Sequence, residues 1–401
     1  MRILVISQYF YPEQFRINDI VRELVKRGHN VTVVTGLPNY PEGKIYDGYE
    51  DAYKTTSVYE GAVVYRCNLR PRKSGFFNLG LNYISFVNGA KRVLKKIKPD
   101  FDIIYVYEVS PIFQAIPAIK HGKKYNIPVV LYNMDVWPEC VRDRETKPMS
   151  KANPIYLIAK HYSKYIYRNV DLILNKCDDF SEYLGDMFGI SAEKMLTLPE
   201  HAEGTYLSVK DTPLDNGIID FMFLGNIGKS QNCEMILDAF TRIDSSSAAL
   251  HFVGSGSALP SLKLKAKQLS LQNVYFYGQQ SLEKVIDYYN LADVCVLALS
   301  NKTVSGLTPP GKLFSYMAAN RLVLASINGS SQTIIDDSKC GYYCEADNCE
   351  ELSYLMQNIL SHPNLINSLG KNGREYFIKH YTIENHIRVL DSIFQSMVVK
   401  C

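Results

Sequence analysis

Short apolar runs alternate with longer amphipathic segments along the whole chain. Residues 2–7 form a continuous apolar run that ends in a polar turn, as expected of a buried parallel strand. Residues 16–27 have the apolar spacing of a helix closed by Gly28, and residues 30–35 form the next apolar run. This order of strand, helix and strand predicts a βαβ unit at the start of an α/β fold.

The alternation continues through both halves of the chain. Further strands are predicted over residues 103–107, 128–132, 171–175, 220–224, 249–253, 274–277, 293–299 and 322–327. Further helices are predicted over residues 150–168, 233–240, 259–269, 282–290 and 383–399. The polar residues 201–217 interrupt the pattern as a linker. We therefore expect an N-terminal domain over residues 1–200, a C-terminal domain over residues 218–382 and a final helix within residues 383–401.

Three glycine-containing loops in the second half each follow a predicted strand. The first contains Gly225, Asn226, Gly228, Lys229 and Gln231, the second contains Gly254 and Gly256, and the third begins at Gly278. The carboxyl ends of parallel strands meet at one edge of a sheet, where nucleotides bind in doubly wound folds. The repetition of this loop on successive strands favours a nucleotide site.

A second signal for a phosphate site lies between the last two predicted strands. The small residues Ser305 and Gly306 precede Thr308, which is a good N-cap, and Pro309, which can open a helix. The unpaired N–H groups of that helix start, with Lys312 in its first turn, suit a diphosphate. An ordinary αβ unit with a proline cap explains the same residues equally well.

Composition and charge describe a soluble globular enzyme. The 401 residues are 46% hydrophobic and 21% charged, and the net charge of +3 does not call for a nucleic acid partner. No apolar run reaches the roughly 18 residues of a membrane span, and no signal peptide precedes the first strand, so we expect a cytoplasmic protein. The nine cysteines follow no zinc pattern and are expected to be reduced.

Residues 70–98 hold eight basic side chains and no acidic one. Their apolar residues recur at helical spacing, and Phe76 and Phe77 precede the helix. A basic element with an aromatic tip suits an anionic membrane surface. A domain helix with a solvated charged face is the competing interpretation.

Two predicted strands of the first half end in residues that could bind a sugar. One ends in Tyr107 and Glu108, and the other is followed by Asn-Met-Asp-Val-Trp-Pro-Glu, which contains Asp135, Trp137 and Glu139. An apolar ring beside carboxylates fits a sugar face and its hydroxyls. In the competing interpretation Trp137 is a core residue and the carboxylates are surface acids.

The order of a small loop, proline, Lys312, an apolar helix and a buried strand resembles the nucleotide-sugar motif of retaining glycosyltransferases of family four. The Trp137 segment and the opening Tyr-Phe-Tyr-Pro-Glu-Gln-Phe-Arg resemble the WbuB-like subgroup of O-antigen and capsule biosynthesis. The resemblance implies the GT-B fold, in which two doubly wound Rossmann-like domains face a central cleft. It also implies a C-terminal helix that crosses back to the first domain.

The resemblance implies transfer of a sugar, with retention and without a metal or other cofactor, from a nucleoside-diphosphate donor to a lipid-linked saccharide. It implies a UDP-linked, N-acetylated or deoxy sugar. The basic residues 70–98 with Phe76 and Phe77 lead us to expect an undecaprenyl diphosphate type of acceptor and peripheral association with the inner face of the plasma membrane. The nucleotide-sugar residues would be Gly225, Asn226, Gly228, Lys229, Gln231, Gly254, Gly256, Ser305, Gly306, Thr308, Pro310, Lys312 and Ser315. The acceptor residues would be Pro12, Asn18, Tyr107, Asp135, Trp137 and Glu139, and the catalytic residues Glu108, Asp135 and Lys312.

The chain departs from the family pattern at three places. Leu307 and Ser315 stand where the family has two glutamates, Asn226 and Gln231 stand in the first phosphate loop, and Tyr107–Glu108 stands where a histidine is frequent. These departures leave two alternatives open. One is an inactive subunit that binds a sugar nucleotide, and the other is a sugar-nucleotide epimerase of the same architecture.

Overall fold

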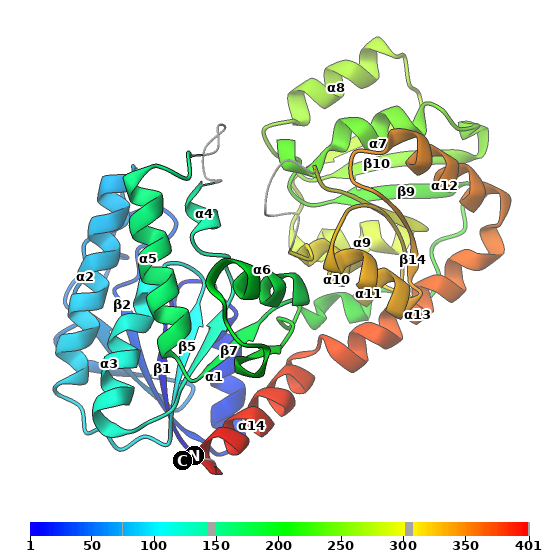
Figure 1. Cartoon of the computed structure of the whole chain (residues 1–401). Coiled ribbons are helices and arrows are strands. Elements are labelled where there is room, and N and C mark those ends of the chain that lie inside the picture. The colour runs from blue at the N-terminus through cyan, green and yellow to red at the C-terminus, as the bar shows by residue number, and fades with distance from the viewer. Residues whose placement is uncertain (74, 143–148, 301–307, 400–401) are drawn as a thin grey trace. The chain divides into compact units, whose positions relative to one another are not determined.

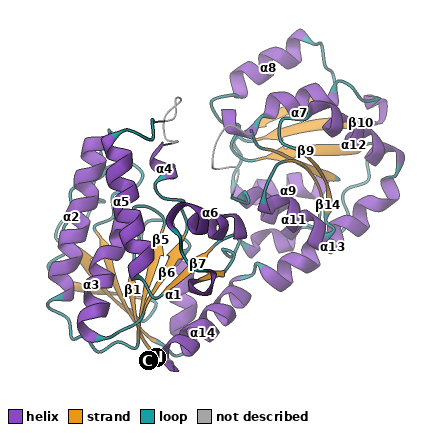
Figure 2. Ribbon diagram, viewed as in Figure 1, coloured by secondary structure: helices purple, strands orange, loops and turns teal. Residues whose placement is uncertain are grey.

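The computed structural model describes residues 1–73, 75–142, 149–300 and 308–399 (Figure 1). The chain forms two compact units. Unit 1 comprises Met1–His201 and Ile383–Cys401, and unit 2 comprises Ala202–Thr382. Each unit has a sheet of mainly parallel strands with helices packed on both faces (Figure 2). Within the described ranges, no helix is both long enough and apolar enough to cross a membrane.

The sheet of unit 1 has eight strands in the order β3-β4-β2-β1-β5-β6-β7-β8, and its neighbours are parallel except for the β3–β4 hairpin. The strands are β1 Arg2–Ile6, β2 Asn30–Gly36, β3 Thr56–Tyr59, β4 Ala62–Cys67, β5 Ile103–Glu108, β6 Val129–Asn133, β7 Leu172–Asn175 and β8 Met195–Thr197. The helices are α1 Ile17–Lys26, α2 Phe76–Leu94, α3 Ala115–Tyr125, α4 Glu139–Arg142, α5 Pro154–Asn169, α6 Asp178–Phe188 and α14 Ile383–Val399, with a 3-10 turn, η1, at Ile112–Gln114.

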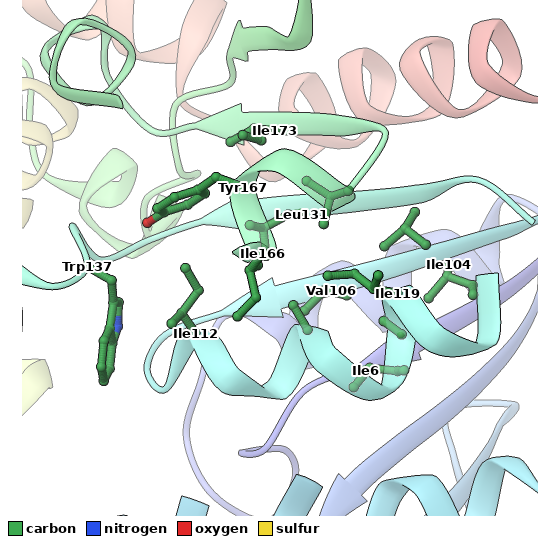
Figure 3. Packing of buried hydrophobic residues seen from close by; sticks show 14 of the residues in the cluster. Ile6, Ile104, Val106, Ile112, Ile119, Leu131, Trp137, Ile166, Tyr167 and Ile173 are labelled. Atoms are coloured by element: carbon green, nitrogen blue, oxygen red, sulfur yellow. The ribbon is translucent and has the colours of Figure 1, made fainter. Parts of the chain in front are cut away.

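Both faces of this sheet are buried, which explains why its central strands are apolar without interruption. In β1, Leu4 and Ile6 contribute to one core cluster, whereas Ile3 and Val5 contribute to the cluster on the other face. Residues of α2, α3, α5 and α6 belong to the first cluster, part of which Figure 3 shows around Ile6, Ile104 and Trp137. Residues of α1 and α14 belong to the second.

Helix α14 belongs to unit 1 although it follows all of unit 2 in the chain. Its residues Ile387, Leu390 and Phe394 are buried, and the ring of Phe394 lies edge-on to Tyr105 of β5 with centroids 5.4 Å apart. The chain therefore passes between the units twice, as predicted from the sequence.

The sheet of unit 2 has six parallel strands in the order β11-β10-β9-β12-β13-β14. The strands are β9 Ile219–Leu224, β10 Ala248–Val253, β11 Val274–Gly278, β12 Val294–Ala298, β13 Leu322–Ser326 and β14 Gly341–Cys344. The helices are α7 Cys233–Phe240, α8 Leu259–Gln268, α9 Leu282–Leu291, α10 Gly311–Ala318, α11 Ser330–Ser338, α12 Cys349–Ser361 and α13 Ile366–His380. The strand order reverses between β9 and β12, which makes the edge beside them the expected ligand position.

The predicted fold class, an α/β chain with two doubly wound domains, is confirmed. Two helix starts are wrong. The helix predicted from residue 150 begins at Pro154, after the N-cap Asn153. Helix α10 begins at Gly311 rather than Pro309, because Pro310 has extended backbone angles (φ −72°, ψ 142°) and occupies the N-cap position. Thr308 therefore does not cap this helix. The predicted loop residues Ser305, Gly306 and Leu307 lie outside the described residues.

Candidate functional site

Unit 2 has a cavity of about 400 Å³ at the carboxyl ends of β9 and β10, next to the start of α10. Strand β9 is one of the two strands between which the strand order reverses. Five predicted residues line it: Gly225, Asn226, Gly254, Lys312 and Ser315. Other lining residues that the sequence did not single out include Tyr206, Ser255, Gln279, Gln280, Val285 and Tyr289. The cavity has the size of a small-ligand site.

Two glycines allow the loops after β9 and β10 to approach each other. Gly225 has φ +126° and Gly254 has φ +142°, conformations that side chains with a Cβ rarely adopt. A Cβ on Gly254 would lie 1.8 Å from the carbonyl oxygen of Gly225, and a Cβ on Gly225 would lie 2.5 Å from Cε of Lys312. The close backbone approach requires glycine at position 254, the positive φ favours it at position 225, and both residues line the cavity.

Lys312 brings a cation to the rim of this cavity. Its Nζ donates to Oε1 of Gln231 at 2.5 Å and to the carbonyl oxygen of Asn226 at 3.2 Å, and it lies 4.0 Å from the ring centroid of Phe223. An ammonium group has three donors, so one remains for a ligand. Burial lowers the pKa of Lys312 to about 8, so the group is still charged at pH 7.

The start of α10 is fixed against β9 by Tyr316. Its hydroxyl accepts a hydrogen bond from the backbone N–H of Leu224 at 3.1 Å and donates to the carbonyl of the same residue at 3.3 Å. Tyr316 is fully buried, and this bond places the first turn of α10 beside Gly225. Ser315 lines the cavity, but its hydroxyl donates to the carbonyl of Gly311 in its own helix at 3.2 Å.

The remaining predicted nucleotide residues lie near this site without lining the cavity. The side-chain oxygen of Gln231 accepts a hydrogen bond from the ammonium group of Lys312, so Gln231 helps to position that lysine. The Lys229 side chain is exposed in the 3-10 turn Lys229–Gln231. Gly256 packs against the backbone of Ile227, where a Cβ would meet the carbonyl oxygen at 2.3 Å. Gly228, Thr308 and Pro310 are described but are not among the residues that line the cavity.

Glu108 and Asp135 meet at the carboxyl edge of the sheet in unit 1. The backbone N–H of Ser110 donates to Glu108 at 2.9 Å, and its hydroxyl donates to Asp135 at 2.6 Å. Glu108 is completely buried, so it is not the surface acid that the competing interpretation expected. Burial, followed by the charge of Asp135, raises the pKa of Glu108 well above its usual range. This shift favours the neutral form of Glu108 beside the half-buried Asp135.

Trp137 is a core residue, in agreement with the second interpretation of its sequence. Its exposed fraction is 2%, its Nε1 donates to the hydroxyl of Ser110 at 3.1 Å, and Phe113 lies edge-on at 5.3 Å. Glu139 is also buried, so it is not the surface acid of the competing interpretation. Its oxygens accept hydrogen bonds from the hydroxyls of Tyr156 and Tyr183 and from the guanidinium of Arg142.

The predicted acceptor residues Tyr107 and Asn18 form hydrogen bonds within unit 1. The Tyr107 hydroxyl donates to Glu200 at 2.9 Å. Asn18 accepts from the N–H of Tyr11 at 2.9 Å and donates to the carbonyl of Glu13 at 2.8 Å, which holds the loop that contains Pro12. These contacts occupy the polar atoms that the sequence interpretation assigned to a sugar.

Comparison with known proteins assigns both halves of the chain to glycosyltransferase domains. Residues 15–200 match the model described as Glycosyltransferase Family 4, and residues 208–376 match the model described as Glycosyl transferases group 1. The boundary between the matches falls close to the division of the structure at His201 and Ala202.

Two curated relatives extend this likeness. The chain is 23% identical over 337 residues to the putative colanic acid biosynthesis glycosyl transferase WcaI of Escherichia coli K12, which covers 79% of this chain and 81% of that protein. It is 27% identical over 164 residues to the probable glycosyltransferase WbjE of Pseudomonas aeruginosa, which covers 40% of each.

Solved structures of low sequence identity share the fold. The sucrose-phosphate synthase of Thermosynechococcus elongatus has a TM-score of 0.71 at 17% identity and covers 100% of both chains. HepE of Anabaena, solved in complex with UDP, has a TM-score of 0.71 at 11% identity and covers 99% of this chain and 100% of its own. The predicted GT-B class is confirmed.

Proposed function

We propose that this chain, a glycosyltransferase by both of its domain matches, transfers a sugar from a nucleoside diphosphate to a lipid-linked saccharide in the assembly of a bacterial surface polysaccharide. The observation that carries the proposal is the cavity of unit 2, where Gly225, Gly254 and Lys312 meet beside β9, the strand next to the reversal of strand order. The name of WcaI supports the polysaccharide context, and the UDP complex of HepE supports a uridine donor.

The donor would lie along this cavity with its diphosphate toward α10. The backbone of Gly225, the first turn of α10 and the free donor of Lys312 supply the positive end. Val285 and Tyr289 offer apolar contact for the base and ribose, and Gln279 offers a hydrogen-bonding amide. Ser315 takes the place of a family glutamate and offers a hydroxyl to the ribose or the sugar.

Catalysis would require positive charge where the diphosphate leaves. Departure of the nucleoside diphosphate places negative charge on its phosphates, and a preorganised cation stabilises that charge in the transition state. Lys312 fills this role, and no metal is required in the proposed reaction, which retains the configuration of the sugar. In unit 1, Asp135 accepts a hydrogen bond from an acceptor hydroxyl. The raised pKa of Glu108 favours its neutral form, which reduces charge repulsion between Glu108 and Asp135.

The acceptor is proposed to be a saccharide linked to an undecaprenyl diphosphate type of lipid at the inner membrane face. The acid-free residues 70–98 favour an anionic surface, and the Phe77 side chain in this stretch is 78% exposed. The protein would then be cytoplasmic and peripherally bound, and its attachment would weaken as salt rises.

A donor screen with a lipid-diphosphate-sugar acceptor tests the proposal. Transfer from one UDP-sugar, unchanged by a chelator and with retained anomeric configuration, is the expected result. Binding of UDP without transfer or hydrolysis would identify an inactive binding subunit. Conversion of the donor sugar in the absence of any acceptor would identify an epimerase. If a chelator abolished turnover and magnesium restored it, the proposal of a metal-independent reaction would be wrong.

A further inference from the structure

A second cavity, of about 610 Å³, lies among the helices of unit 1. Helices α2 and α5 form its walls, and both pack against η1, which leads into α3. Its interior is lined by aromatic and aliphatic side chains, including Tyr83, Val87, Phe113, Trp137 and Ala159. The volume falls within the range of small-ligand sites, and it is distinct from the sheet edge that holds Glu108.

The rim of this cavity exposes large apolar side chains. Phe77 and Ile84 of α2 are 78% and 59% exposed, and Ile158 of α5 is 56% exposed. Ile155 and Tyr162 of α5 extend the same rim. Contiguous exposed apolar surface is uncommon on soluble proteins and marks a place where an apolar partner binds.

The surrounding helices are strongly biased in charge. Helices α2, α3 and α5 contain two, three and three basic residues respectively, and none of the three helices contains Asp or Glu. Lys91 of α2 and Lys120 of α3 line the cavity, and neither forms a hydrogen bond or ion pair with another described residue. Burial and then the charge of Lys120 lower the pKa of Lys91. Two such ammonium groups are complementary to an anion.

The occupant must therefore be apolar along its length and anionic at one end. An extended peptide segment would bring unpaired backbone N–H and C=O groups into a cavity whose lining is mainly carbon, where they could not be satisfied. The hydrocarbon chain of a lipid phosphate has no such groups. The phosphate of that lipid would lie near Lys91 and Lys120.

We infer that this cavity binds the hydrocarbon chain of the lipid phosphate that carries the acceptor sugar, and that Lys91 and Lys120 bind its phosphate. The inference rests on the proposed function, because it assigns the lipid part of the same acceptor. It concerns binding of a single chain in a cavity, which differs from adsorption of the basic surface to a membrane.

Trp137 provides a direct reporter, because it is the single tryptophan of the chain and lines the cavity. Soluble farnesyl diphosphate, used below its aggregation concentration, should change the Trp137 emission in a saturable way. Farnesol should bind about tenfold more weakly because it lacks the anion, and pyrophosphate alone should leave the emission unchanged. If farnesyl diphosphate leaves the Trp137 emission unchanged, the inference is wrong.

Gly80→Leu is the variant that fills the cavity. Gly80 lies in α2 and lines the cavity, and a Cβ there would meet no atom within 4 Å, so leucine is tolerated and also favours the helix. It should weaken farnesyl diphosphate binding by at least about tenfold. The matched control is Gly185→Leu in α6, where the nearest atom to a Cβ is 3.9 Å away and which should leave binding unchanged. Equal binding by both variants would overturn the inference.

Lys91→Gln and Lys120→Gln test the anionic end. Each should reduce the preference for farnesyl diphosphate over farnesol by about tenfold, whereas Lys96→Gln, on the exposed turn after α2, should not. If anionic vesicles bind equally to the wild type and Gly80→Leu while soluble lipid does not bind, the surface is a membrane contact and the inference fails. UDP binding and transfer to other acceptors report on unit 2 separately, so failure of the proposed function is distinguishable.

Discussion

Both sheets are doubly wound, but different kinds of residue stand at the carboxyl ends of their strands. In unit 2, Gly225 and Gly254 follow adjacent strands and leave a cavity between their loops. In unit 1, β5, β6 and β7 end in Glu108, Asn133 and Asn175, all fully buried, and the two asparagines bond to each other at 2.9 Å. The apolar cavity of unit 1 lies instead among helices. Side-chain size at the strand ends therefore decides where each unit can accept a ligand.

The largest effect is expected from a substitution at Gly254, where the loops after β9 and β10 approach each other. Gly254→Ala should cost about 3 kcal/mol of stability and abolish UDP binding, because the new Cβ meets the Gly225 carbonyl in a strained conformation. Chemical denaturation and calorimetry with UDP measure both quantities. Gly278→Ala is the control, since Gly278 also has positive φ (+68°) but no atom within 4 Å of a Cβ, and it should cost about 1 kcal/mol. Equal costs would show that close approach of the loops is unimportant.

The second effect concerns the cation of the same edge. Lys312→Ala should weaken UDP binding by about 1.5–3 kcal/mol, the loss of one charge-assisted hydrogen bond. Lys229→Ala removes an exposed lysine that does not line the cavity, and it should change the affinity by less than about 0.5 kcal/mol. Unchanged affinity in Lys312→Ala, measured by calorimetry, would remove this residue from the site.

The third effect is a pH dependence confined to unit 2. Burial lowers the pKa of Lys312 to about 8, so its charge is present below that pH and is lost as the pH rises through it. UDP affinity should fall by about tenfold between pH 7 and 9, because most of the lysine is neutral at the upper limit. Lys312→Arg keeps the charge and should flatten the profile. An identical slope in that variant would place the titrating group elsewhere.

The smallest effect concerns Glu108, the buried carboxyl at the end of β5 in unit 1. The raised pKa of Glu108 means that wild-type stability falls as pH rises above the ordinary value of 4.5 and through the folded pKa. Glu108→Gln removes that loss, so it should be more stable than wild type by about 1 kcal/mol at pH 8 and lose this advantage near pH 4. Denaturation at several pH values measures it.

Glu139→Gln is the opposite case for comparison. It weakens the bond from Arg142 and should destabilise unit 1. Destabilisation by Glu108→Gln at pH 8 would show that the Glu108 carboxylate is ionised and held by its neighbours.

The central strands and the glycine loops could be predicted because their signals are local. A fully buried parallel strand is apolar at every position, and a loop that must adopt positive φ selects glycine. The edge hairpin of β3 and β4 escaped prediction because β3 is mainly exposed and has no apolar run. Tyr206 escaped because it comes from a 3-10 turn, Gly204–Ser208, inside a segment with the composition of a linker.

The chemistry of unit 1 could not be predicted because packing across the chain decides it. A tryptophan beside two acids has the same local sequence whether it faces a sugar or the core, and here Phe113 and Tyr83 enclose it. The acid-free character of α2 was visible in the sequence. Its continuation over α3 and α5 was not, because these helices lie far apart along the chain.

The return of α14 to unit 1 has a consequence for synthesis of the protein on the ribosome. Until residues near Phe394 have emerged, the sheet face that holds Ile3, Val5 and Tyr105 lacks the helix that completes its cover. Unit 2 lies wholly between the two parts of unit 1 and can close before that point. The second domain in the sequence can therefore mature first. The first domain must wait, with apolar surface open to chaperones, for the last helix to be translated.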